Sequence, residues 1–392
     1  MVRPRRSPRP SQVVLALLFA SFASACALTG PAGAPPPGAR DETAPRLSPE
    51  AGAYLDSAVA VMRRDAVHRA ELDFAAIADS VRAFAAGAQT VEDTYPALKR
   101  ALPLLQDHHS SFWTAAEVRD NFGFTPEDIE TIKAGTAPQI DPSKVDSLRA
   151  SLDYASGRVI DGLAGERVGY LVVPEFDNLF EEGMALFADS LQSLIRSLDR
   201  DGVAGWVVDL RANRGGNVVP MVVGLGPLLD TDNVYYTVDA GGTEMSASYY
   251  RDGGYYSVEA GGEEGEPLIR SSVGYRLSVP DRPVAVLTAW KTASSAEAVT
   301  ALFAGQPNVA VIGQKTNGLT SVNAFNFLGD DSVLNLTSGY LANRERTVYP
   351  QGIAPDIEVP PGEADAASGD AALERAAAWI ASGRRANRGM RP

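Results

Sequence analysis

The sequence predicts an α/β protein in which a small bundle of helices precedes a core of alternating strands and helices. From residue 168 onward, short apolar runs typical of buried strands alternate with longer segments of helical periodicity, which is the pattern of an α/β core. Between residues 48 and 107, apolar residues recur only at helical spacing. The chain has 392 residues, of which 45% are hydrophobic, so it can bury the cores of about two domains.

Residues 1–25 are predicted to form a secretory signal peptide. A basic start is followed by an apolar stretch over residues 13–22, which is too short to span a bilayer comfortably, and then by Ala23, Ser24 and Ala25. The basic residues of the start are Arg3, Arg5, Arg6 and Arg9. We therefore expect an exported protein of the cell envelope.

Cys26 is the only cysteine, so the chain cannot form an internal disulfide. It directly follows the small residues of the cleavage site, where bacterial lipoproteins carry their acylated cysteine. We therefore predict lipid attachment at Cys26 and membrane contact through that anchor. Ala23 to Ala25 also fit an ordinary signal-peptidase site, which leaves a soluble periplasmic form open. Residues 26–47, which include the proline-rich stretch 31–37, are predicted to be a linker.

The predicted bundle occupies residues 48–115. Ser48 and Pro49 are typical of a helix start, and a second helix begins near Phe74 and stops at Gly87. Thr90 opens a third helix, with Asp93 three residues later. Residues 116–165 are polar, with helical patches but no series of strands, and are predicted to be a connecting segment.

The predicted core occupies residues 166–362. Its strands are expected at 168–173, 203–210, 284–287, 309–312 and 332–340, and its helices at 180–198 and 295–304. Residues 231–280, rich in Gly, Tyr and Glu, predict a β-rich insertion. Residues 363–392 are expected to hold a C-terminal helix, near 371–382, and a tail.

Composition excludes two classes of function. Charged residues make up 21% of the chain and the net charge is -14, which argues against nucleic-acid binding because that needs a basic face. Three histidines and one cysteine offer no convincing metal-ligand spacing, so we predict no metal and no cofactor.

Ser294 is the first candidate catalytic residue. It follows a buried strand and begins a helix, whose free N–H groups and positive potential would stabilise a developing oxyanion. The alternative is that Ser294 or Ser295 only caps the helix, the usual role of serine there. Residues 209–217 form a second candidate, because Gly215 and Gly216 allow backbone N–H groups to approach a ligand closely. The alternative there is a plain tight turn.

His109 is the third candidate, in the run Asp107-His108-His109-Ser110 at the end of the third predicted helix. A general base needs a pKa near the working pH, and histidine has one without a large perturbation. The alternative is a pair of surface histidines.

Taken together and in order, these motifs resemble the tail-specific (carboxy-terminal processing) serine protease family. The motifs are Asp-x-His-Ser at 107–110, Asp-Leu-Arg-x-Asn-x-Gly-Gly at 209–216, Ser-x-x-Glu at 294–297, Gly-x-x-Thr-x-Gly at 313–318 and Gly-Ile-x-Pro-Asp at 352–356. The resemblance covers about 168–360 well and 48–112 loosely. It implies a crotonase-like ββα core, hydrolysis of peptide bonds and an exported location.

The chain differs from many members of this family in two respects, which limit the resemblance to one branch of the family. Many members place a catalytic lysine directly after the Gly-x-x-Thr-x-Gly turn, where this chain has Leu319, which cannot act as a base. The chain is therefore closer to the histidine-containing branch, which includes tricorn-like enzymes and the nisin resistance protein. The stretch between His109 and Val168 is also too short for the PDZ domain of many members.

The resemblance assigns Ser294, rather than Ser295, as the nucleophile and His109 as the base. The N–H of Ser295 and one from Gly215 or Gly216 would hold the oxyanion. Glu297 is the first choice for the group that orients His109. Asp107 and Glu345 are weaker choices, and Lys291 and Lys315 are alternative bases.

The predicted substrate is a peptide or an unfolded protein, bound in a cleft between the bundle and the core. A non-catalytic ligand-binding protein on the same fold is the alternative, because a fold does not fix a function. A crotonase-like acyl-CoA enzyme is a third possibility, which export to a compartment without coenzyme A disfavours.

Overall fold

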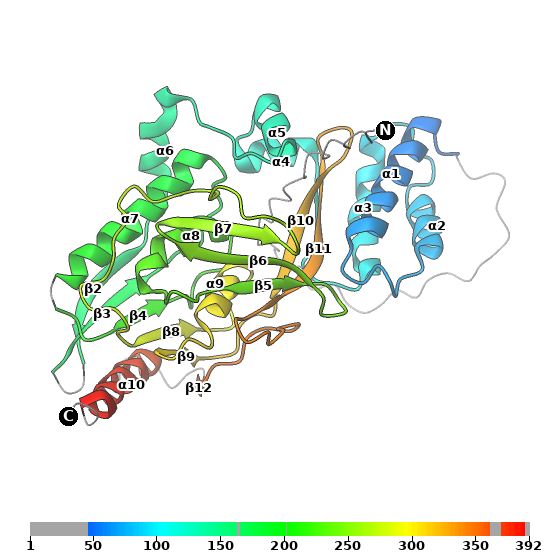
Figure 1. The fold of residues 1–392 in the computed structure, drawn as a ribbon. Helices are drawn as coiled ribbons and strands as arrows, with labels where there is room; N and C mark the ends of the chain where they lie inside the picture. Colours follow the sequence, from blue (N-terminus) through cyan, green and yellow to red (C-terminus); the bar gives the residue numbers. More distant parts are fainter. Residues whose placement is uncertain (1–45, 163–164, 201, 361–369, 389–392) are drawn as a thin grey trace, which may run out of the picture.

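The computed structural model describes residues 46–162, 165–200, 202–360 and 370–388, with side chains described up to residue 382. The predicted signal peptide, Cys26 and nearly all of the linker lie outside these residues. Over the described part, the protein is a mixed α/β fold with two six-stranded sheets and a group of N-terminal helices (Figure 1). None of the helices in this part is long and apolar enough to cross a membrane.

The first two N-terminal helices begin where the sequence predicts, and the third begins at Tyr95 rather than at Thr90. They are α1 (Pro49–Asp65), α2 (Phe74–Phe84) and α3 (Tyr95–Ala101), with single 3₁₀ turns at Glu92–Thr94 and Leu102–Leu105. Ser48 Oγ accepts a hydrogen bond from the N–H of Ala51 and so caps α1. The apolar faces of these helices pack against one face of the first sheet, where Leu55 and Leu98 share a cluster with Leu334.

The first sheet, sheet A, is antiparallel and centred on β11. Its strands are β1 (Ser111–Trp113), β5 (Tyr235–Val238), β6 (Glu244–Arg251), β7 (Gly254–Glu259), β10 (Ser321–Phe327) and β11 (Val333–Ala342). Strand β11 pairs with β10 along most of its length and also with β1 and β5. In Figure 1, β10 and β11 lie between helices α1–α3 and the rest of the molecule. The β-rich stretch predicted at 231–280 thus supplies β5–β7 of a sheet that also includes β1.

The second sheet, sheet B, has the order β12-β9-β8-β4-β3-β2 and is parallel except for the β2–β3 pair. Its strands are β2 (Ser156–Asp161), β3 (Arg167–Val172), β4 (Trp206–Asp209), β8 (Val284–Thr288), β9 (Val309–Gly313) and β12 (Ile357–Glu358). The loops that follow β4, β8 and β9 leave the same edge, where ligands usually bind in such sheets.

Helices cover both faces of sheet B. On one face lie α7 (Glu181–Asp199), α8 (Val218–Leu225) and α9 (Ser295–Phe303), which build the largest core with Trp206 and Val286. On the other face lies α10 (Ala371–Arg388), whose Ala376 and Ile380 pack on Val207. The helices α7, α9 and α10 and the strands β3, β8, β9 and β11 agree with the predicted segments.

The structure differs from the sequence prediction at β2, α8 and β10. Strand β2 lies in the segment predicted to lack strands, because this edge strand is partly exposed and polar. All residues of α8 are buried, so its sequence has no polar face to mark a helical period. The rest of that segment forms α4 (Ala115–Phe122), α5 (Pro126–Lys133), a 3₁₀ turn at Pro142–Lys144 and α6 (Val145–Ser151).

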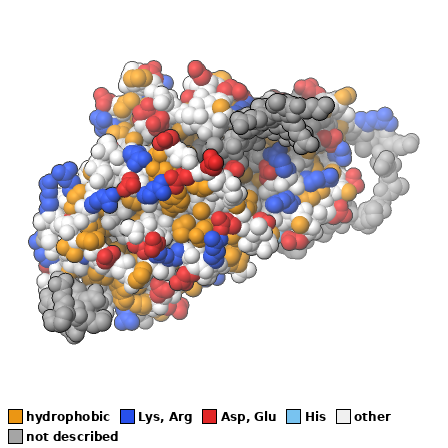
Figure 2. Space-filling model, viewed as in Figure 1, with side chains coloured by type: hydrophobic (Ala, Val, Ile, Leu, Met, Phe, Trp, Pro, Cys, Tyr) orange, Lys and Arg blue, Asp and Glu red, His pale blue; other side chains and the backbone are white. Residues whose placement is uncertain are grey.

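The surface carries charges of both signs. On the face shown in Figure 2, acidic and basic side chains are interspersed rather than gathered into a basic region.

Candidate active site

Ser294 lies between β8 and α9 in a strained backbone conformation. Its φ is 52° and its ψ is -116°, a combination that non-glycine residues rarely adopt and that is found most often at functional sites. The side chain is fully buried, and its Oγ has no hydrogen-bond partner among the described residues. A buried hydroxyl held in a strained turn without a partner is unusual for a serine that only caps a helix.

The Gly215–Gly216 turn packs directly against Ser294. Both glycines have positive φ, 119° and 101°. A Cβ added to Gly215 would lie 2.8 Å from the Cβ of Ser294, and one added to Gly216 would lie 2.2 Å from the carbonyl oxygen of Phe176. Only glycine therefore fits at these two positions, and the turn is brought beside Ser294 as the sequence predicts.

The two glycine N–H groups differ in their partners. The N–H of Gly215 donates to Asn213 Oδ1 at 2.8 Å, so its hydrogen bond is made within the turn itself. The N–H of Gly216 donates to none of the residues that the structure describes. Of the two glycines, one of which is predicted to be an oxyanion donor, Gly216 is therefore the one whose N–H has no acceptor among the described residues.

Asn213 is a site residue that the sequence analysis did not single out. It is fully buried, and its Nδ2 donates to the carbonyl oxygens of Val173 and Pro174 at 3.2 and 2.8 Å. Its side chain therefore joins the turn after β4 to the end of β3. The sequence signal that could have marked Asn213 is its position in the motif, two residues before Gly215.

Glu297 is bonded to the loop around Ser294 rather than to the imidazole of His109. Its Oε2 accepts from the N–H of Ser294 at 2.9 Å, and its Oε1 accepts from Thr316 Oγ1 at 2.5 Å and from the N–H of Gly318 at 2.9 Å. The prediction that Glu297 orients His109 is therefore corrected. Burial raises the pKa of the Glu297 carboxyl to about 7, although these hydrogen bonds act to lower it.

His109 lies in the turn between α3 and β1 and is buried, while the neighbouring His108 is exposed. Its Nδ1 is 2.8 Å from Ser321 Oγ, and its carbonyl oxygen accepts from Asn323 Nδ2 at 2.8 Å. Asp107 Oδ1 accepts a hydrogen bond from the backbone N–H of His109 at 3.0 Å, so the bond of Asp107 to His109 is made to the backbone and not to the imidazole. Ser321 is therefore the residue seen to orient the imidazole, and no sequence signal marked it.

One short segment links the serine and the histidine. Gly318 donates to Glu297, which holds the backbone of Ser294, and three residues later Ser321 bonds to His109. The Gly-x-x-Thr-x-Gly turn and the start of β10 therefore connect the two candidate catalytic residues, one from each sheet.

The alternative residues named from the sequence lie elsewhere. Lys291 and Lys315 are exposed, and Lys291 Nζ lies 5.5 Å from the ring centre of the exposed Trp290. Glu345 is exposed and lies beside Gly305, at the opposite end of α9 from Ser294. The structure describes no group of three or more His, Cys, Asp or Glu side chains placed to hold a metal.

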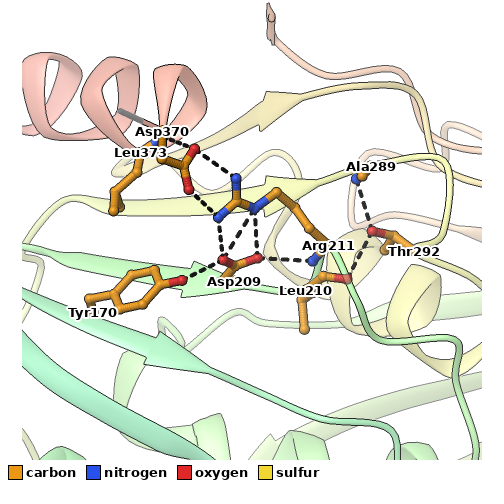
Figure 3. Close-up of polar contacts among 8 residues, drawn as sticks. All are labelled: Tyr170, Asp209, Leu210, Arg211, Ala289, Thr292, Asp370 and Leu373. Carbon is orange, nitrogen blue, oxygen red and sulfur yellow. Dashed lines mark hydrogen bonds and ion pairs between the residues drawn. The ribbon is translucent and has the colours of Figure 1, made fainter. Parts of the chain in front are cut away.

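The charged residues of the Asp-Leu-Arg motif form a supporting network (Figure 3). The guanidinium of Arg211 bridges Asp209, at 2.6 Å, and Asp370, also at 2.6 Å, just before α10. Tyr170 donates its hydroxyl to Asp209 at 2.6 Å. Thr292 donates to the carbonyl oxygen of Leu210 at 2.9 Å, so the same turn also holds the approach to Ser294.

Comparison with known proteins gives a match to one peptidase family and to two curated proteins. Residues 167–359 match Peptidase family S41. The nisin-resistance protein of Lactococcus lactis subsp. lactis is 32% identical over 193 residues, which are 48% of this chain and 55% of that protein. A carboxyl-terminal-processing protease of Synechocystis sp. is 24% identical over 234 residues, 59% of this chain and 47% of that protein. The chain thus spans about half the length of the curated relatives it matches.

Solved structures share the fold over more of the chain. A lipoprotein from Streptococcus agalactiae superposes with a TM-score of 0.62 and 20% identity, covering 86% of this chain and 98% of that one. The photosystem II D1 C-terminal processing protease gives a TM-score of 0.52 and 16% identity, covering 80% and 94%. At these identities the likeness establishes the fold alone, including the N-terminal helices.

Proposed function

Because residues 167–359 belong to peptidase family S41, we propose that this protein is a serine endopeptidase that works through a Ser294–His109 acyl-enzyme. The observation that carries the proposal is the geometry at Ser294. Its unpartnered Oγ stands in a strained turn at the start of α9, directly against the Gly215–Gly216 turn. Sheet B with α7–α9 corresponds to the crotonase-like core that the family resemblance implies.

The reaction divides into acylation and deacylation. Ser294 Oγ attacks the carbonyl carbon of the scissile peptide bond, and His109 takes the hydroxyl proton. Since Nδ1 of His109 is bonded to Ser321, Nε2 is the nitrogen that accepts this proton. His109 then protonates the leaving amine, and the C–N bond breaks to leave an ester on Ser294. A water molecule, deprotonated by His109, hydrolyses the ester and frees Ser294.

The oxyanion of each tetrahedral intermediate is stabilised by backbone donors. The N–H of Gly216 and that of Ser295, at the first position of α9, are the proposed pair. One such donor contributes about 3 kcal/mol to transition-state stabilisation. The positive N-terminal end of the α9 dipole would also stabilise the negative charge of the oxyanion. The substrate is a peptide or an unfolded protein, and the chemistry needs no cofactor.

Digestion of casein by the purified protein tests the mechanism. Ser294→Ala and His109→Ala should each lower kcat/KM by at least about a thousandfold. His108→Ala is the matched control, because His108 is the exposed neighbour of His109 and should keep its activity. A Ser294→Ala variant that cleaves casein as well as the native chain would rule out the mechanism.

Two further measurements separate the alternatives. Labelling by a fluorophosphonate probe that requires Ser294 distinguishes a peptidase from a non-catalytic ligand-binding protein. The double variant Lys291→Ala, Lys315→Ala should retain activity, because both lysines are exposed. Its inactivation would instead favour a serine–lysine mechanism.

We also propose that the protein is exported and anchored through a lipid on Cys26. The supports are the basic and apolar start of the chain, the small residues before Cys26, and the lipoprotein of Streptococcus agalactiae that shares the fold. Cells fed labelled palmitate should incorporate it into the native chain but not into Cys26→Ala. Equal labelling of both chains, or of neither, would contradict the anchor.

A further inference from the structure

A small apolar pocket lies where the starts of α7 and α8 meet two loops, one between α5 and α6 and one between β7 and β8. We call it the α7–α8 pocket. Its volume is about 180 Å³, which suits a single side chain rather than a drug-sized ligand, whose pockets measure about 300–1,000 Å³. The inner wall consists of the buried Leu179, Met184 and Val219, and the partly exposed Ala137 and Leu268 complete the sides.

The α7–α8 pocket adjoins the proposed oxyanion turn through Asn217, the residue after Gly216. Asn217 is fully buried, and its Nδ2 lies 3.1 Å from Met184 Sδ. The same Nδ2 donates to the carbonyl oxygen of the residue before Leu179 at 3.2 Å, and Asn217 Oδ1 accepts from the N–H of Val219 at 3.0 Å. Asn217 therefore connects every part of the inner wall to Gly216.

The mouth of the pocket carries a negative charge. Glu181, in the first turn of α7, and Thr136 are the exposed residues that line it. The Oε2 of Glu181 accepts from Gln139 Nε2, a neutral donor, at 3.3 Å, and no cation of the described residues pairs with this carboxylate. The N–H of Glu181 donates to the carbonyl oxygen of Pro138 at 3.0 Å, which joins the loop to the start of α7. An apolar pocket thus opens beside a carboxylate without a counter-charge.

Resting on the proposed peptidase function, we propose that the α7–α8 pocket binds a lysine or arginine side chain of the peptide substrate, with the cationic end at Glu181. Such side chains bury their methylene stems against apolar surface while the charged end stays in water, which is the arrangement that this pocket offers. A purely apolar side chain would leave Glu181 without a counter-charge, and an acidic one would be repelled. The net charge of -14 also favours the approach of cationic peptides.

The place of the pocket limits which substrate residue can enter it. Val219 is three residues after Gly216, a span of at most about 10 Å. Successive residues of an extended peptide lie about 3.3 Å apart. The bound side chain therefore belongs to a residue within about three positions of the scissile bond, whose carbonyl oxygen contacts Gly216 in the proposed mechanism.

Cleavage of quenched fluorescent peptides tests the role of Glu181. The peptides carry Lys, norleucine, Ala or Glu at each position within three residues of one cleaved bond, and norleucine has a straight apolar stem without a charge. At one position, the native chain should show a kcat/KM at least about tenfold higher for the Lys peptide than for the Glu peptide, and added salt should reduce this ratio.

Glu181→Gln should lower that ratio at least about fivefold and change kcat/KM for the norleucine peptide less than about twofold, because only the charge is removed. Glu127→Gln is the matched control, since Glu127 is an exposed glutamate in the first turn of α5. A preference for norleucine over Lys that does not depend on Glu181 would overturn the assignment of a cationic side chain.

Filling the pocket tests the role of its apolar walls. Ala137→Phe should lower kcat/KM for the Lys and norleucine peptides at least about tenfold and for the Ala peptide less than about twofold, and Ala137→Val should give a smaller change in the same direction. Equal values for all peptides in the native chain and in Ala137→Phe would overturn the proposal. If Ala137→Phe fails to fold, Glu181→Gln decides, because Glu181 is exposed.

Peptide binding separates this proposal from the proposed function. Fluorescence anisotropy of labelled Lys and Glu peptides on Ser294→Ala measures binding without catalysis, and Glu181→Gln added to that variant should remove most of the difference between the two peptides. If the native chain proves inert while Ser294→Ala still prefers the Lys peptide, the peptidase function fails and the pocket assignment stands. If casein is cleaved but neither cleavage nor binding of the Lys peptide depends on Glu181 or Ala137, the pocket assignment is overturned alone.

Discussion

At the scale of single residues, the polar groups around Ser294 are almost all engaged. Asn213 accepts a hydrogen bond from the N–H of Gly215, and Glu297 accepts one from the N–H of Ser294. Ser321 Oγ is hydrogen-bonded to the imidazole of His109. Among the described residues, the hydroxyl of Ser294 and the N–H of Gly216 have no partner. In the proposed mechanism these two groups are the nucleophile and an oxyanion donor.

Replacing Gly215 by alanine should impair catalysis more than folding. The new Cβ would lie 2.8 Å from the Cβ of Ser294 and 3.1 Å from the nitrogen of Ser295, so the nucleophile must move. A displacement of about 1 Å costs about a hundredfold in rate, which kcat/KM on casein would show. Gly52→Ala is the control, since a Cβ there meets nothing within 4 Å and alanine favours helix α1 by roughly 0.5–1 kcal/mol. Equal activity of Gly215→Ala and the native chain would contradict the packing described.

The Glu297 carboxyl should make stability depend on pH. Burial raises its pKa from 4.5 to about 7, so the folded protein binds this proton more tightly than the unfolded chain does. Its contribution to the free energy of unfolding is fully present below pH 4.5 and is lost as the pH rises through 7, a change of about 3 kcal/mol.

Urea unfolding of the native chain and of Glu297→Gln between pH 5.5 and 8.5 measures this contribution, because glutamine does not titrate. Burial also raises the pKa of Asp177, to about 6, but its contribution is common to both proteins and cancels in the comparison. Parallel pH profiles of the two proteins would show that Glu297 does not titrate in this range.

The sequence singled out Ser294, His109 and the Gly215–Gly216 turn as candidates, because each lies in a motif at the end of a predicted strand or helix. It could not identify Ser321 as the partner of His109, since a serine in a strand has no periodicity that distinguishes a buried partner from an exposed side chain. The role assigned to Glu297 was wrong for a related reason. A carboxylate one turn into a helix bonds most readily to the N–H groups of its own helix start.

At the scale of elements, a network of ion pairs connects helix α10 to the edge of sheet B. Arg211 joins Asp209, at the end of β4, to Asp370, which precedes α10. The side chain of Asp209 is 8% exposed and that of Arg211 is 27% exposed, so the pair is mostly removed from water. The charged residues of the Asp-Leu-Arg motif therefore connect the end of β4 to the start of α10.

Removing the guanidinium of Arg211 should destabilise the protein strongly. Arg211→Met leaves Asp209 buried without its cation, which costs about 3–5 kcal/mol. Arg82→Met removes the exposed ion pair with Asp56 and should cost less than about 1 kcal/mol. Urea unfolding of both variants measures the difference. Similar losses from the two variants would mean that the Arg211 network contributes no more than a surface ion pair.

The sequence predicted the helices and strands whose apolar residues recur at a regular spacing or form a short bounded run. It missed the elements that lack such a pattern. Helix α7 shows an apolar face, and β8 and β9 are short apolar runs bounded by turns. Helix α8 is apolar on every side, and β10 carries polar Asn323 and Asn326 among its apolar residues. Pairing between distant strands, such as β1 with β11, follows from tertiary packing and has no local signal.

At the scale of the whole molecule, the N-terminal helices share one core with sheet A. The cluster that contains Leu55 and Leu98 also contains Leu334 and Leu336 of β11. The helices therefore cannot leave the sheet without exposing apolar surface on both, which favours a single cooperative unit.

Leu98→Ala tests this coupling. The side chain is fully buried, so its loss should cost about 2–5 kcal/mol. Calorimetry should show one transition at lower temperature, with activity lost in parallel. Val348→Ala, at a side chain that is 38% exposed, should leave the transition nearly unchanged. A second transition in Leu98→Ala would show that the helices unfold separately from the sheet.

The pairing of β1 with β11 also sets the point during synthesis at which the surroundings of His109 can form. The hydrogen bond between Ser111 and Asn335 joins positions 224 residues apart, so His109 cannot be anchored until β11 has emerged from the ribosome. A chain that crosses a membrane in an unfolded state would do so with Ser294 and His109 still far apart.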